Sequence, residues 1–404
     1  MRIALVSVSD QLGGSEVVLL QIVEQVRRAR PAWDVHVILP GDGPLSARAA
    51  SLGARVHTLR FPPALASLGE WGSAARPRSV LKQLTAAAGA LPAYERSFAA
   101  VLNSIQPDVI HSNGFKAHIV ASRARTKAAR VWHIHEYVSS RPATRRLLRV
   151  YADTPQAILG NSRSVAEDVR RALQGRKHAD VTVVHNGVAL ERFVPTGSTL
   201  DLDAASGLTA APVGTVRVGL VATFARWKGH DVFLRALGQL RTPTTVRGYV
   251  IGAPVYDTAG SQWSLEDLHK IAADAGVQPR VGFAGFQADV PAVLRALDVV
   301  VHASVQPEPF GLVVAEAMAC ARAVTTSGQG GAGEIVRPGE TAILHDAGEA
   351  TSLARAIDRL ADDAALRERL GRAGRQMVEE HFSADRFGEA IVAHYEAVRA
   401  AGVA

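Results

Sequence analysis

Short apolar runs alternate with helical segments along both halves of the chain, and this alternation is the strongest constraint on the fold. In the first half, residues 3–8, 35–39 and 109–111 read as strands, with amphipathic or Ala-rich segments between them. A second series of the same kind starts at Val216. This βαβ order predicts α/β architecture with parallel, doubly wound sheets. Ligands of such sheets bind beyond the carboxyl ends of the strands, so the residues that follow each strand are the candidate site residues.

The chain has 404 residues, which exceeds one domain of usual size and suggests two. Over residues 196–214 the composition shifts to Thr, Ser, Gly, Ala and Pro. This shift predicts a linker between a first domain, 1–195, and a second domain, 215–381. Residues 62–78 are rich in Ala, Ser, Gly, Pro and Arg, and we expect them to form an irregular surface loop.

Composition and charge exclude several classes of protein. The single cysteine, Cys320, cannot form an intrachain disulfide, which fits a reducing compartment. The chain starts too polar for a signal peptide, and no apolar run approaches the ~20 residues of a membrane span, so we expect a cytoplasmic protein. A net charge of +7 and a pI near 9.8 favour anionic partners. Nucleic acid is not indicated, since no zinc-finger spacing or RNA motif is present; nucleotide phosphates and an anionic membrane surface remain.

Residues 306–320 carry the densest set of chemical features. Two prolines flank Glu308 and confine its backbone to extended or turn conformations, and the Leu, Ala, Met and Glu residues after Gly311 read as a helix. Glu308 should then lie on a loop just before this helix and Glu316 about two turns into it. A helix start attracts phosphate, and carboxylates accept hydrogen bonds from sugar hydroxyls. The stretch predicts a ligand that is both phosphorylated and polyhydroxylated.

Further loops of the second half follow predicted strands at the same edge. Arg226 and Lys228 stand where the strand from Val216 meets the next helix, so together with a helix start they can neutralise a diphosphate. The alternative is exposed surface charge. Gly252 ends the following strand, and Phe286 belongs to a short strand and turn that can wall a flat base. We expect these loops to converge on one crevice.

The loops of the first half are less specific. Gly13 and Gly14 follow the first strand without a third glycine at dinucleotide spacing, so a tight turn and a contact with a ligand phosphate are equally open. His135 follows another strand and is a candidate contact or proton relay for an acceptor hydroxyl; the alternative is a hydrogen-bonded interior histidine. We expect His133 to face the opposite side of the strand end from His135.

The sequence gives little support for a metal site. Asp201 and Asp203 form an acidic pair on the predicted linker, where we expect them to be solvated. One histidine-rich set is an alternative that we rank low, because no further ligand is suggested by spacing. This set is His111, His133, His135 and Glu136.

One predicted helix near residue 145 is strongly basic. Its arginines are accompanied by Leu147, Leu148 and Val150. A solvated helix face is the favoured interpretation, and a surface for anionic lipid is the alternative. The arginines are Arg141, Arg145, Arg146 and Arg149.

The motifs taken together resemble glycosyltransferase family 4, whose members are retaining enzymes of the GT-B type. The likeness covers nearly the whole chain and is strongest in the second half. The matching blocks are Glu308–Leu312, Glu316–Ala319, Trp227–Gly229, Phe283–Phe286, Gly330 and Gly331 with Glu334, Asn186–Val188 with Glu191 and Phe193, Gly13–Glu16, and His135 with Glu136.

The resemblance implies a GT-B-type α/β fold, in which two Rossmann-like doubly wound domains face each other across a cleft. The second domain would bind a nucleotide-sugar donor and the first an acceptor, and the helix from residue 382 to 404 would join the first domain. Glu308 would contact the donor sugar and Glu316 the ribose. The family's basic pair and helix start would bind the diphosphate, the family's glycine-rich loop matches Gly13 and Gly14, and its histidine near the reacting centre matches His135. The residues for the pair and the helix start are Lys228, Arg226, Phe310, Gly311 and Leu312.

The sequence departs from the family pattern at two places. The usual arginine, five residues before Lys228, is Thr223, so Arg226 is the candidate replacement. Ala321 and Ala323 stand where Gly and Pro are common, which we interpret as a variation in packing.

The resemblance implies transfer of a sugar from a nucleoside-diphosphate sugar to a hydroxyl, with retention at the anomeric carbon and without a metal or other cofactor. Double displacement would need a nucleophilic carboxylate, which the sequence does not indicate. The resemblance implies same-face attack, in which the leaving diphosphate helps to remove the acceptor proton. The acceptor is expected to be a small molecule or a cell-envelope, lipid-linked or secondary-metabolite glycan, reached at the inner face of the membrane. The alternatives are a nucleotide-sugar 2-epimerase and a non-catalytic nucleotide-sugar-binding protein; a dehydrogenase ranks low because the dinucleotide fingerprint is absent.

Overall fold

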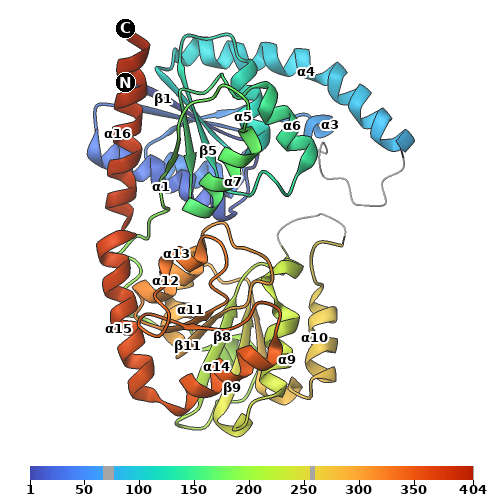
Figure 1. The fold of residues 1–404 in the computed structure, drawn as a ribbon, viewed down its shortest axis with the longest axis vertical. Coiled ribbons are helices and arrows are strands. Elements are labelled where there is room, and N and C mark those ends of the chain that lie inside the picture. Colours follow the sequence, from blue (N-terminus) through green and yellow to red (C-terminus); the bar gives the residue numbers. More distant parts are fainter. Residues whose placement is uncertain (67–76, 255–259, 404) are drawn as a thin grey trace. The chain divides into compact units, whose positions relative to one another are not determined.

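The computed structural model describes residues 1–66, 77–254 and 260–403 (Figure 1). It divides into two compact units, the first made of Met1–Gly187 with Ala384–Ala404 and the second of Val188–Ser383. The chain therefore leaves the first unit at Gly187, eight residues before the predicted boundary at 195, and returns to it at Ala384.

Within the described residues, the first unit contains a seven-stranded parallel sheet. Its strand order is β3-β2-β1-β4-β5-β6-β7, so the direction of winding reverses between β1 and β4. This reversal is the point of a doubly wound sheet where ligands bind. The strands are β1 (Arg2–Ser7), β2 (Asp34–Leu39), β3 (Arg55–Thr58), β4 (Val109–Asn113), β5 (Ala129–Ile134), β6 (Ala157–Gly160) and β7 (Val181–Val183).

Helices cover both faces of this sheet because residues alternate in direction along each strand. Ala4 and Ile110 pack with residues of α4 and α5, whereas His111, the next residue, contacts α16 on the other face. α16 also runs beside α1, where Arg28 pairs with Asp385 (Figure 1). The helices are α1 (Gly14–Ala29), α2 (Pro44–Ser51), α3 (Pro63–Ala66), α4 (Pro77–Ile105), α5 (Phe115–Arg123), α6 (Pro142–Val150), α7 (Arg163–Leu173) and α16 (Ala384–Val403).

The second unit repeats this architecture with a six-stranded parallel sheet among the described residues. Its order is β10-β9-β8-β11-β12-β13, and the winding reverses between β8 and β11. The strands are β8 (Val216–Val221), β9 (Val246–Ile251), β10 (Val281–Gly285), β11 (Val299–His302), β12 (Ala323–Thr326) and β13 (Ile343–Leu344).

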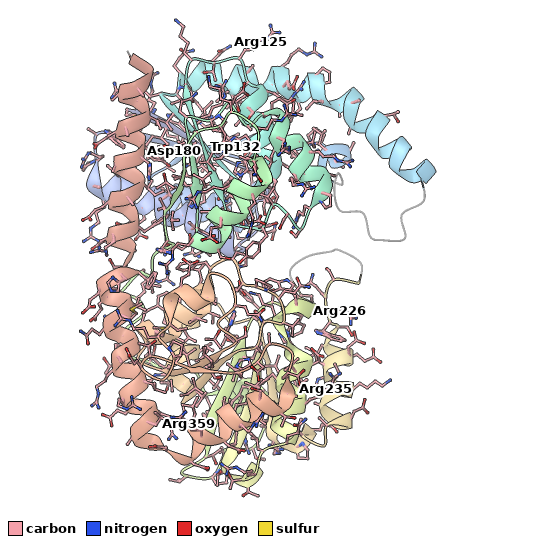
Figure 2. All side chains as sticks on the ribbon, viewed as in Figure 1. Arg125, Trp132, Asp180, Arg226, Arg235 and Arg359 are labelled. Carbon is pink, nitrogen blue, oxygen red and sulfur yellow. The ribbon has the colours of Figure 1, made fainter. Side chains whose placement is uncertain are left out.

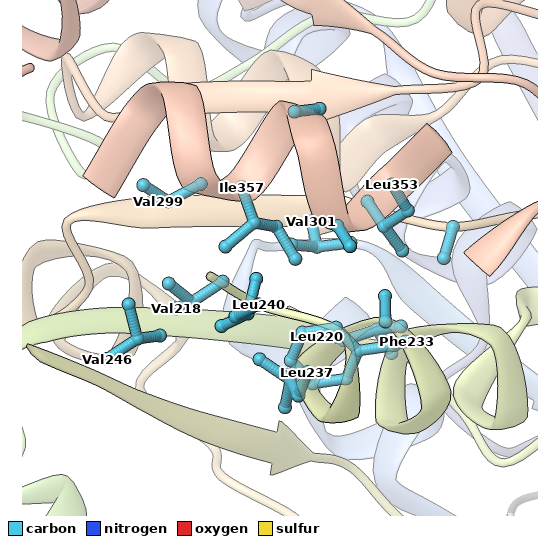
Figure 3. Packing of buried hydrophobic residues seen from close by; sticks show 14 of the residues in the cluster. Val218, Leu220, Phe233, Leu237, Leu240, Val246, Val299, Val301, Leu353 and Ile357 are labelled. Atoms are coloured by element: carbon cyan, nitrogen blue, oxygen red, sulfur yellow. The ribbon is translucent and has the colours of Figure 1, made fainter. Parts of the chain in front are cut away.

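The core of the second unit lies between this sheet and its helices. Val218 and Val301 meet Phe233 of α9 and Ile357 of α14, all of them buried (Figure 3). The helices are α8 (Leu202–Ala205), α9 (His230–Gly238), α10 (Leu265–Asp274), α11 (Val290–Ala296), α12 (Leu312–Ala319), α13 (Ala332–Ile335), α14 (Ala350–Asp362) and α15 (Ala364–His381), with 3₁₀ turns η1 (Arg226–Lys228), η2 (Pro243–Thr245) and η3 (Gln278–Arg280). The two parallel sheets confirm the predicted α/β fold.

The segment predicted as an interdomain linker, 196–214, belongs instead to the second unit. Asp203, expected on the surface, is buried and accepts hydrogen bonds from the Tyr249 hydroxyl and the Arg247 guanidinium, both at 2.6 Å. Burial alone would raise its pKa, but these donors lower the pKa of Asp203 to about 2. Asp203 therefore anchors this segment to β9, and the expectation that it is solvated is wrong. Asp201 is exposed, as expected, and caps α8 by accepting from the Ala204 N–H at 3.0 Å.

The surface loop predicted over residues 62–78 lies mostly outside the described residues. In the described part, Pro63–Ala66 is helical and α4 starts at Pro77. In the parts of the chain that the structure describes, no helix has the length and apolar character needed to cross a membrane.

The backbone conformation at Ala321 explains why glycine is common at this position of the family pattern. Ala321 follows the C-cap of α12 and has φ of +54°, in the left-handed region that glycine occupies readily. We expect Ala321→Gly to stabilise the protein by up to about 1 kcal/mol, because a non-glycine residue costs 1–2 kcal/mol there and glycine loses part of that gain in the unfolded chain. Urea denaturation would measure the change, and a lower midpoint for the variant would contradict this explanation.

Candidate active site

The turn that carries Lys228 is fixed by its neighbour across the sheet. It follows β8, and Gly229 closes it with φ of +73°. A Cβ at Gly229 would lie 2.1 Å from the carbonyl oxygen of Ala303, just beyond β11, so only glycine allows this approach. The backbone N–H of Val305 also donates to the carbonyl of Trp227 at 2.8 Å. The two strand ends at the reversal of winding are thus held together.

Lys228 and Glu308 form an ion pair at this point. Lys228 Nζ donates to Glu308 Oε2 at 2.7 Å, and the two side chains are only 18% and 10% exposed. His302 Nε2 and Ser304 Oγ lie 3.1 and 3.0 Å from the same oxygen. Burial acts to raise the pKa of Glu308, but the charge of Lys228 and the hydrogen bond to His302 outweigh it and hold the pKa well below its usual range. Glu308 is therefore a carboxylate at neutral pH.

The loop before α12 places Glu308 beside the helix start, as predicted. Gly311 is the N-cap with φ of +94°, and the helix begins at Leu312. Glu308 also forms a parallel bridge with Gly330, and the Gly331 N–H donates to its carbonyl at 2.7 Å. The first N–H groups of a helix lack intrahelical acceptors and attract anions. A helix start that attracts phosphate and a carboxylate that can accept from hydroxyl groups thus lie beyond one strand end.

Glu316 lies in the second turn of α12 and is half-buried. Its carboxyl group makes no hydrogen bond or ion pair with any residue in the described ranges, although its backbone carbonyl accepts from the Cys320 N–H. Burial raises the pKa of Glu316 to about 7, and the charge of Arg192 only partly opposes this rise. A poorly solvated carboxyl that has no protein partner is suited to accept hydrogen bonds from ligand hydroxyls.

Arg226 lies apart from the Lys228–Glu308 pair. It is exposed, and its guanidinium stacks on the Trp263 ring with 3.8 Å to the centroid, on the side of α10 (Figure 2). No ion pair joins it to Glu308. Its predicted role at the diphosphate stays a prediction.

Gly252 and Phe286 lie at the ends of β9 and β10, as predicted. A Cβ at Gly252 would come 1.9 Å from the Ala222 carbonyl oxygen, and its φ is +147°, so glycine is required by the backbone. Phe286 follows β10 and is 67% exposed. An aromatic ring with this exposure is available to stack on a flat base.

In the first unit, Gly13 and Gly14 lie at the start of α1, beyond β1. Gly13 has an ordinary extended backbone (φ −98°), and a Cβ at Gly14 would meet nothing within 4 Å. Neither the backbone conformation of Gly13 nor the space around Gly14 therefore requires glycine, which favours the open alternative that a ligand approaches here.

This interpretation predicts the outcome of Gly14→Ala. We expect an unchanged or higher melting temperature, because alanine is the better helix former, with kcat/KM for transfer at least about tenfold lower. Gly89→Ala is the matched control: Gly89 also has nothing within 4 Å of an added Cβ, but it lies on the exposed face of α4. Full activity of Gly14→Ala would assign Gly14 to helix formation only.

His135 lies just beyond β5 in a cluster of buried histidines. Its ring centroid is 4.1 Å from that of His133, so the expectation that they face opposite sides is wrong: residues two apart share one face of a strand. Burial lowers the pKa of His135 to about 3, which keeps the ring neutral. Neither of its ring nitrogens has a partner in the described part of the chain. A neutral imidazole of this kind can accept a proton or a hydrogen bond from a ligand hydroxyl.

The alternative metal site is not supported by the geometry. Among the described residues, no group of three or more His, Cys, Asp or Glu side chains is arranged to hold a metal ion. His111 is engaged differently, since its Nδ1 lies 2.9 Å from the Tyr395 hydroxyl of α16.

Two family models match this chain. The model described as glycosyl transferases group 1 matches residues 209–377, and the one described as glycosyltransferase family 4 matches residues 12–192. The chain belongs to glycosyltransferase family 4. Both matched ranges contain predicted site residues, including Lys228 and Glu316 in the first and Gly14 and His135 in the second.

Curated relatives agree with this membership. The chain is 31% identical over 203 residues to the lipopolysaccharide core biosynthesis glycosyltransferase LpsE of Rhizobium meliloti, covering 50% of this chain and 56% of LpsE. It is 30% identical over 289 residues to a D-inositol 3-phosphate glycosyltransferase of Stackebrandtia nassauensis, covering 65% of this chain and 62% of that protein. The matches thus span roughly three-fifths of the length of these relatives.

The solved structures show the GT-B fold. Anabaena HepE in complex with UDP-glucose has a TM-score of 0.79 and 23% identity over 98% of this chain and 100% of its own. Sucrose-phosphate synthase of Thermosynechococcus elongatus has a TM-score of 0.78 and 22% identity, covering 99% of both chains.

The sequence analysis missed three residues of the site in the second unit. His302 and Ser304 both contact Glu308, and Thr326 contacts His302. A signal was available, since His302 ends the apolar run of β11 at the edge where site residues were expected.

Proposed function

We propose that the protein is a retaining, metal-independent glycosyltransferase that moves a sugar from a nucleoside-diphosphate sugar to an acceptor hydroxyl. The observation that carries this proposal is the Lys228–Glu308 pair before the start of α12, with the raised pKa of Glu316 in the second turn of that helix. Family membership supports the same reaction. The titles of the HepE structures name UDP and UDP-glucose as ligands of that protein, which supports a nucleotide-sugar donor here.

In the proposed reaction the donor binds to the second unit. Lys228 and the N–H groups at the start of α12 stabilise the charge that develops on the departing diphosphate, which is the kind of preorganised electrostatics that contributes most to catalysis. Glu308 accepts a hydrogen bond from a sugar hydroxyl, and Glu316 binds the ribose hydroxyls. Retention follows from attack of the acceptor oxygen on the face that the diphosphate leaves, and the diphosphate takes up the acceptor proton.

The acceptor is assigned to the first unit, where Gly14 follows β1 at the reversal of winding and His135 follows β5 at the same edge of the sheet. The names of the relatives, which concern lipopolysaccharide core and inositol phosphate, support a hydroxyl of a cell-envelope, lipid-linked or similar glycan acceptor. The alternatives remain a 2-epimerase and a non-catalytic binding protein of the same fold.

A thermal-shift screen of nucleotide sugars is the first test, because a ligand that binds the native state raises the apparent melting temperature. The donor found in this way is then incubated with candidate acceptors in the presence of EDTA, and proton NMR reads the anomeric configuration of the product. Transfer with retention supports the proposal. An epimerised nucleotide in the absence of acceptor would indicate the epimerase, and binding without any reaction would indicate the binding protein.

We also propose that α6 contacts the anionic inner face of the cell membrane. Leu147 and Val150 are 46% and 62% exposed, one turn apart, and Arg145 and Arg146 beside them are exposed as well. Exposed apolar side chains beside arginines suit an interface with anionic lipid.

Vesicle co-sedimentation tests this surface. We expect binding to phosphatidylglycerol vesicles that is weakened by salt and by the double variant Arg145→Glu/Arg146→Glu, by at least about tenfold given ~1 kcal/mol per basic residue. The control Arg355→Glu/Arg359→Glu makes the same charge change at exposed positions of α14. Equal loss in both double variants would reduce the effect to net charge and exclude a specific α6 surface.

A further inference from the structure

His302 is a buried residue whose two ring nitrogens both have partners. It ends β11, is 4% exposed, and its Nε2 lies 3.1 Å from Glu308 Oε2. Its Nδ1 lies 2.9 Å from the hydroxyl of Thr326, which ends the neighbouring strand β12. His302 therefore connects the Glu308 carboxylate to the next strand of the sheet.

The hydrogen bonds on either side of His302 favour one direction of proton donation, from Thr326 to His302 and from His302 to Glu308. The Gly328 N–H donates to Thr326 Oγ1 at 3.2 Å, and among the described residues Nδ1 of His302 is the acceptor within reach of the Thr326 hydroxyl proton. An imidazole that accepts at Nδ1 carries its proton at Nε2. That proton faces Glu308 Oε2 and Ser304 Oγ, both 3.1 Å from Nε2, and the charged carboxylate oxygen is the stronger acceptor of the two.

Glu308 has two kinds of donor, and they differ in how firmly they are held. Lys228 reaches Oε2 with a flexible four-carbon chain and is also the cation available to a phosphate. His302 and Ser304 are both buried, and both reach the same oxygen from the end of β11. When a diphosphate competes for Lys228, the rigid donors remain.

We propose that His302 is a positioning residue for the donor sugar: it fixes the orientation of the Glu308 carboxylate through the relay Gly328–Thr326–His302–Glu308. This rests on the proposed function, in which Glu308 contacts a hydroxyl of the donor sugar. His302 acts on the sugar and not on the nucleotide, because its side-chain hydrogen bonds within the described ranges lead to Glu308, Ser304 and Thr326. It therefore determines how much better a sugar nucleotide binds than the nucleotide alone.

Two substitutions of His302 separate its two contacts. In His302→Gln the side-chain amide can reach the position of Nε2 and still donate to Glu308, whereas in His302→Asn the shorter amide can replace only Nδ1. Thr326→Val removes the hydroxyl that fixes the tautomer and keeps the shape of the side chain. Thr326→Ser keeps the hydroxyl and is its control.

Calorimetry with UDP-glucose and UDP, or with GDP-mannose and GDP, measures the preference for the sugar nucleotide. We expect His302→Asn and Thr326→Val to lower this preference about tenfold, the value of one charge-assisted hydrogen bond, with the affinity for the bare nucleotide within about twofold of wild type. His302→Gln and Thr326→Ser should keep most of the preference. An unchanged preference in His302→Asn, or equal losses for sugar nucleotide and nucleotide, would overturn the proposal.

A measurement without ligand separates this inference from the proposed function. Long-range ¹H–¹⁵N spectra of the histidine rings report the tautomer, and the His302 signal is identified by its loss in His302→Asn. We expect the Nε2–H tautomer in the wild type and a mixture in Thr326→Val. The Nδ1–H tautomer in the wild type would overturn the relay. Failure of the wild type to bind any nucleotide sugar would instead overturn the proposed function, and the spectrum would still test the relay.

Discussion

Replacing Lys228 by alanine is expected to lower the rate of sugar transfer by about two orders of magnitude or more, judging from the loss of single transition-state donors in other enzymes. The reason is that Lys228 is the cation beside both Glu308 and the start of α12, where the leaving diphosphate is proposed to lie. Steady-state kinetics with the identified donor measures the effect. Near-normal transfer by Lys228→Ala would remove Lys228 from the site.

The same substitution is expected to destabilise the second unit. It leaves the Glu308 carboxylate, 10% exposed, without its main counter-charge, and breaking a buried ion pair from one side typically costs about 3–5 kcal/mol. The double variant Lys228→Ala/Glu308→Gln removes the unpaired charge as well, so it should melt at a higher temperature than Lys228→Ala alone. Identical melting temperatures would show that the two residues are not coupled.

Arg226→Ala tests whether Arg226, the second predicted cation, contributes to sugar transfer. Arg226 stacks on Trp263 in the exposed turn, whereas Lys228 is only 18% exposed and paired. We therefore expect Arg226→Ala to lower transfer much less than Lys228→Ala does. A comparable loss would mean that Arg226 leaves Trp263 when the donor binds.

The sequence predicted the fold well because the fold depends on local patterns. Buried parallel strands such as β1 and β11 are short apolar runs, and the helices between them carry amphipathic spacing, so both sheets could be inferred from their order. The carboxyl ends of parallel strands lie at one edge of a sheet, so the loops after each strand were the expected site loops. This is why Glu308, Lys228, Gly252 and Phe286 are found at strand ends.

Contacts between distant residues were not predictable in the same way. Asp203 lies in a polar, linker-like segment, and its partners Arg247 and Tyr249 follow 44 and 46 residues later. Nothing local distinguishes a buried, paired aspartate from a solvated one. The same holds for His302, whose contact with Glu308 depends on the path of the intervening loop. It also holds for Arg226, because the direction of its side chain toward Trp263 depends on the geometry of a single turn.

The affinity for a nucleotide sugar is expected to fall about tenfold between pH 8 and pH 6 because of Glu316. Its pKa in the unliganded protein is raised to about 7, and an ionised carboxylate is the better acceptor for two ribose hydroxyls. The ionised fraction changes about tenfold over this interval, since it falls tenfold for each unit below the pKa. UDP-glucose is the suitable probe, because the terminal phosphate of UDP itself titrates near pH ~6.

Glu316→Gln provides the control for this pH dependence, since an amide of the same shape does not titrate. Its affinity for UDP-glucose should be low and nearly constant from pH 6 to pH 8, and a slope equal to that of the wild type would assign the titration to another group. The same pKa predicts a stability effect of opposite sign. Because the folded state holds this proton up to pH 7 and the unfolded chain only up to its ordinary value of 4.5, the contribution of Glu316 to unliganded stability falls as the pH rises from 4.5 to 7. Saturating UDP-glucose, which binds the ionised form, should reduce that fall for the wild type, while Glu316→Gln should lack this contribution with or without ligand.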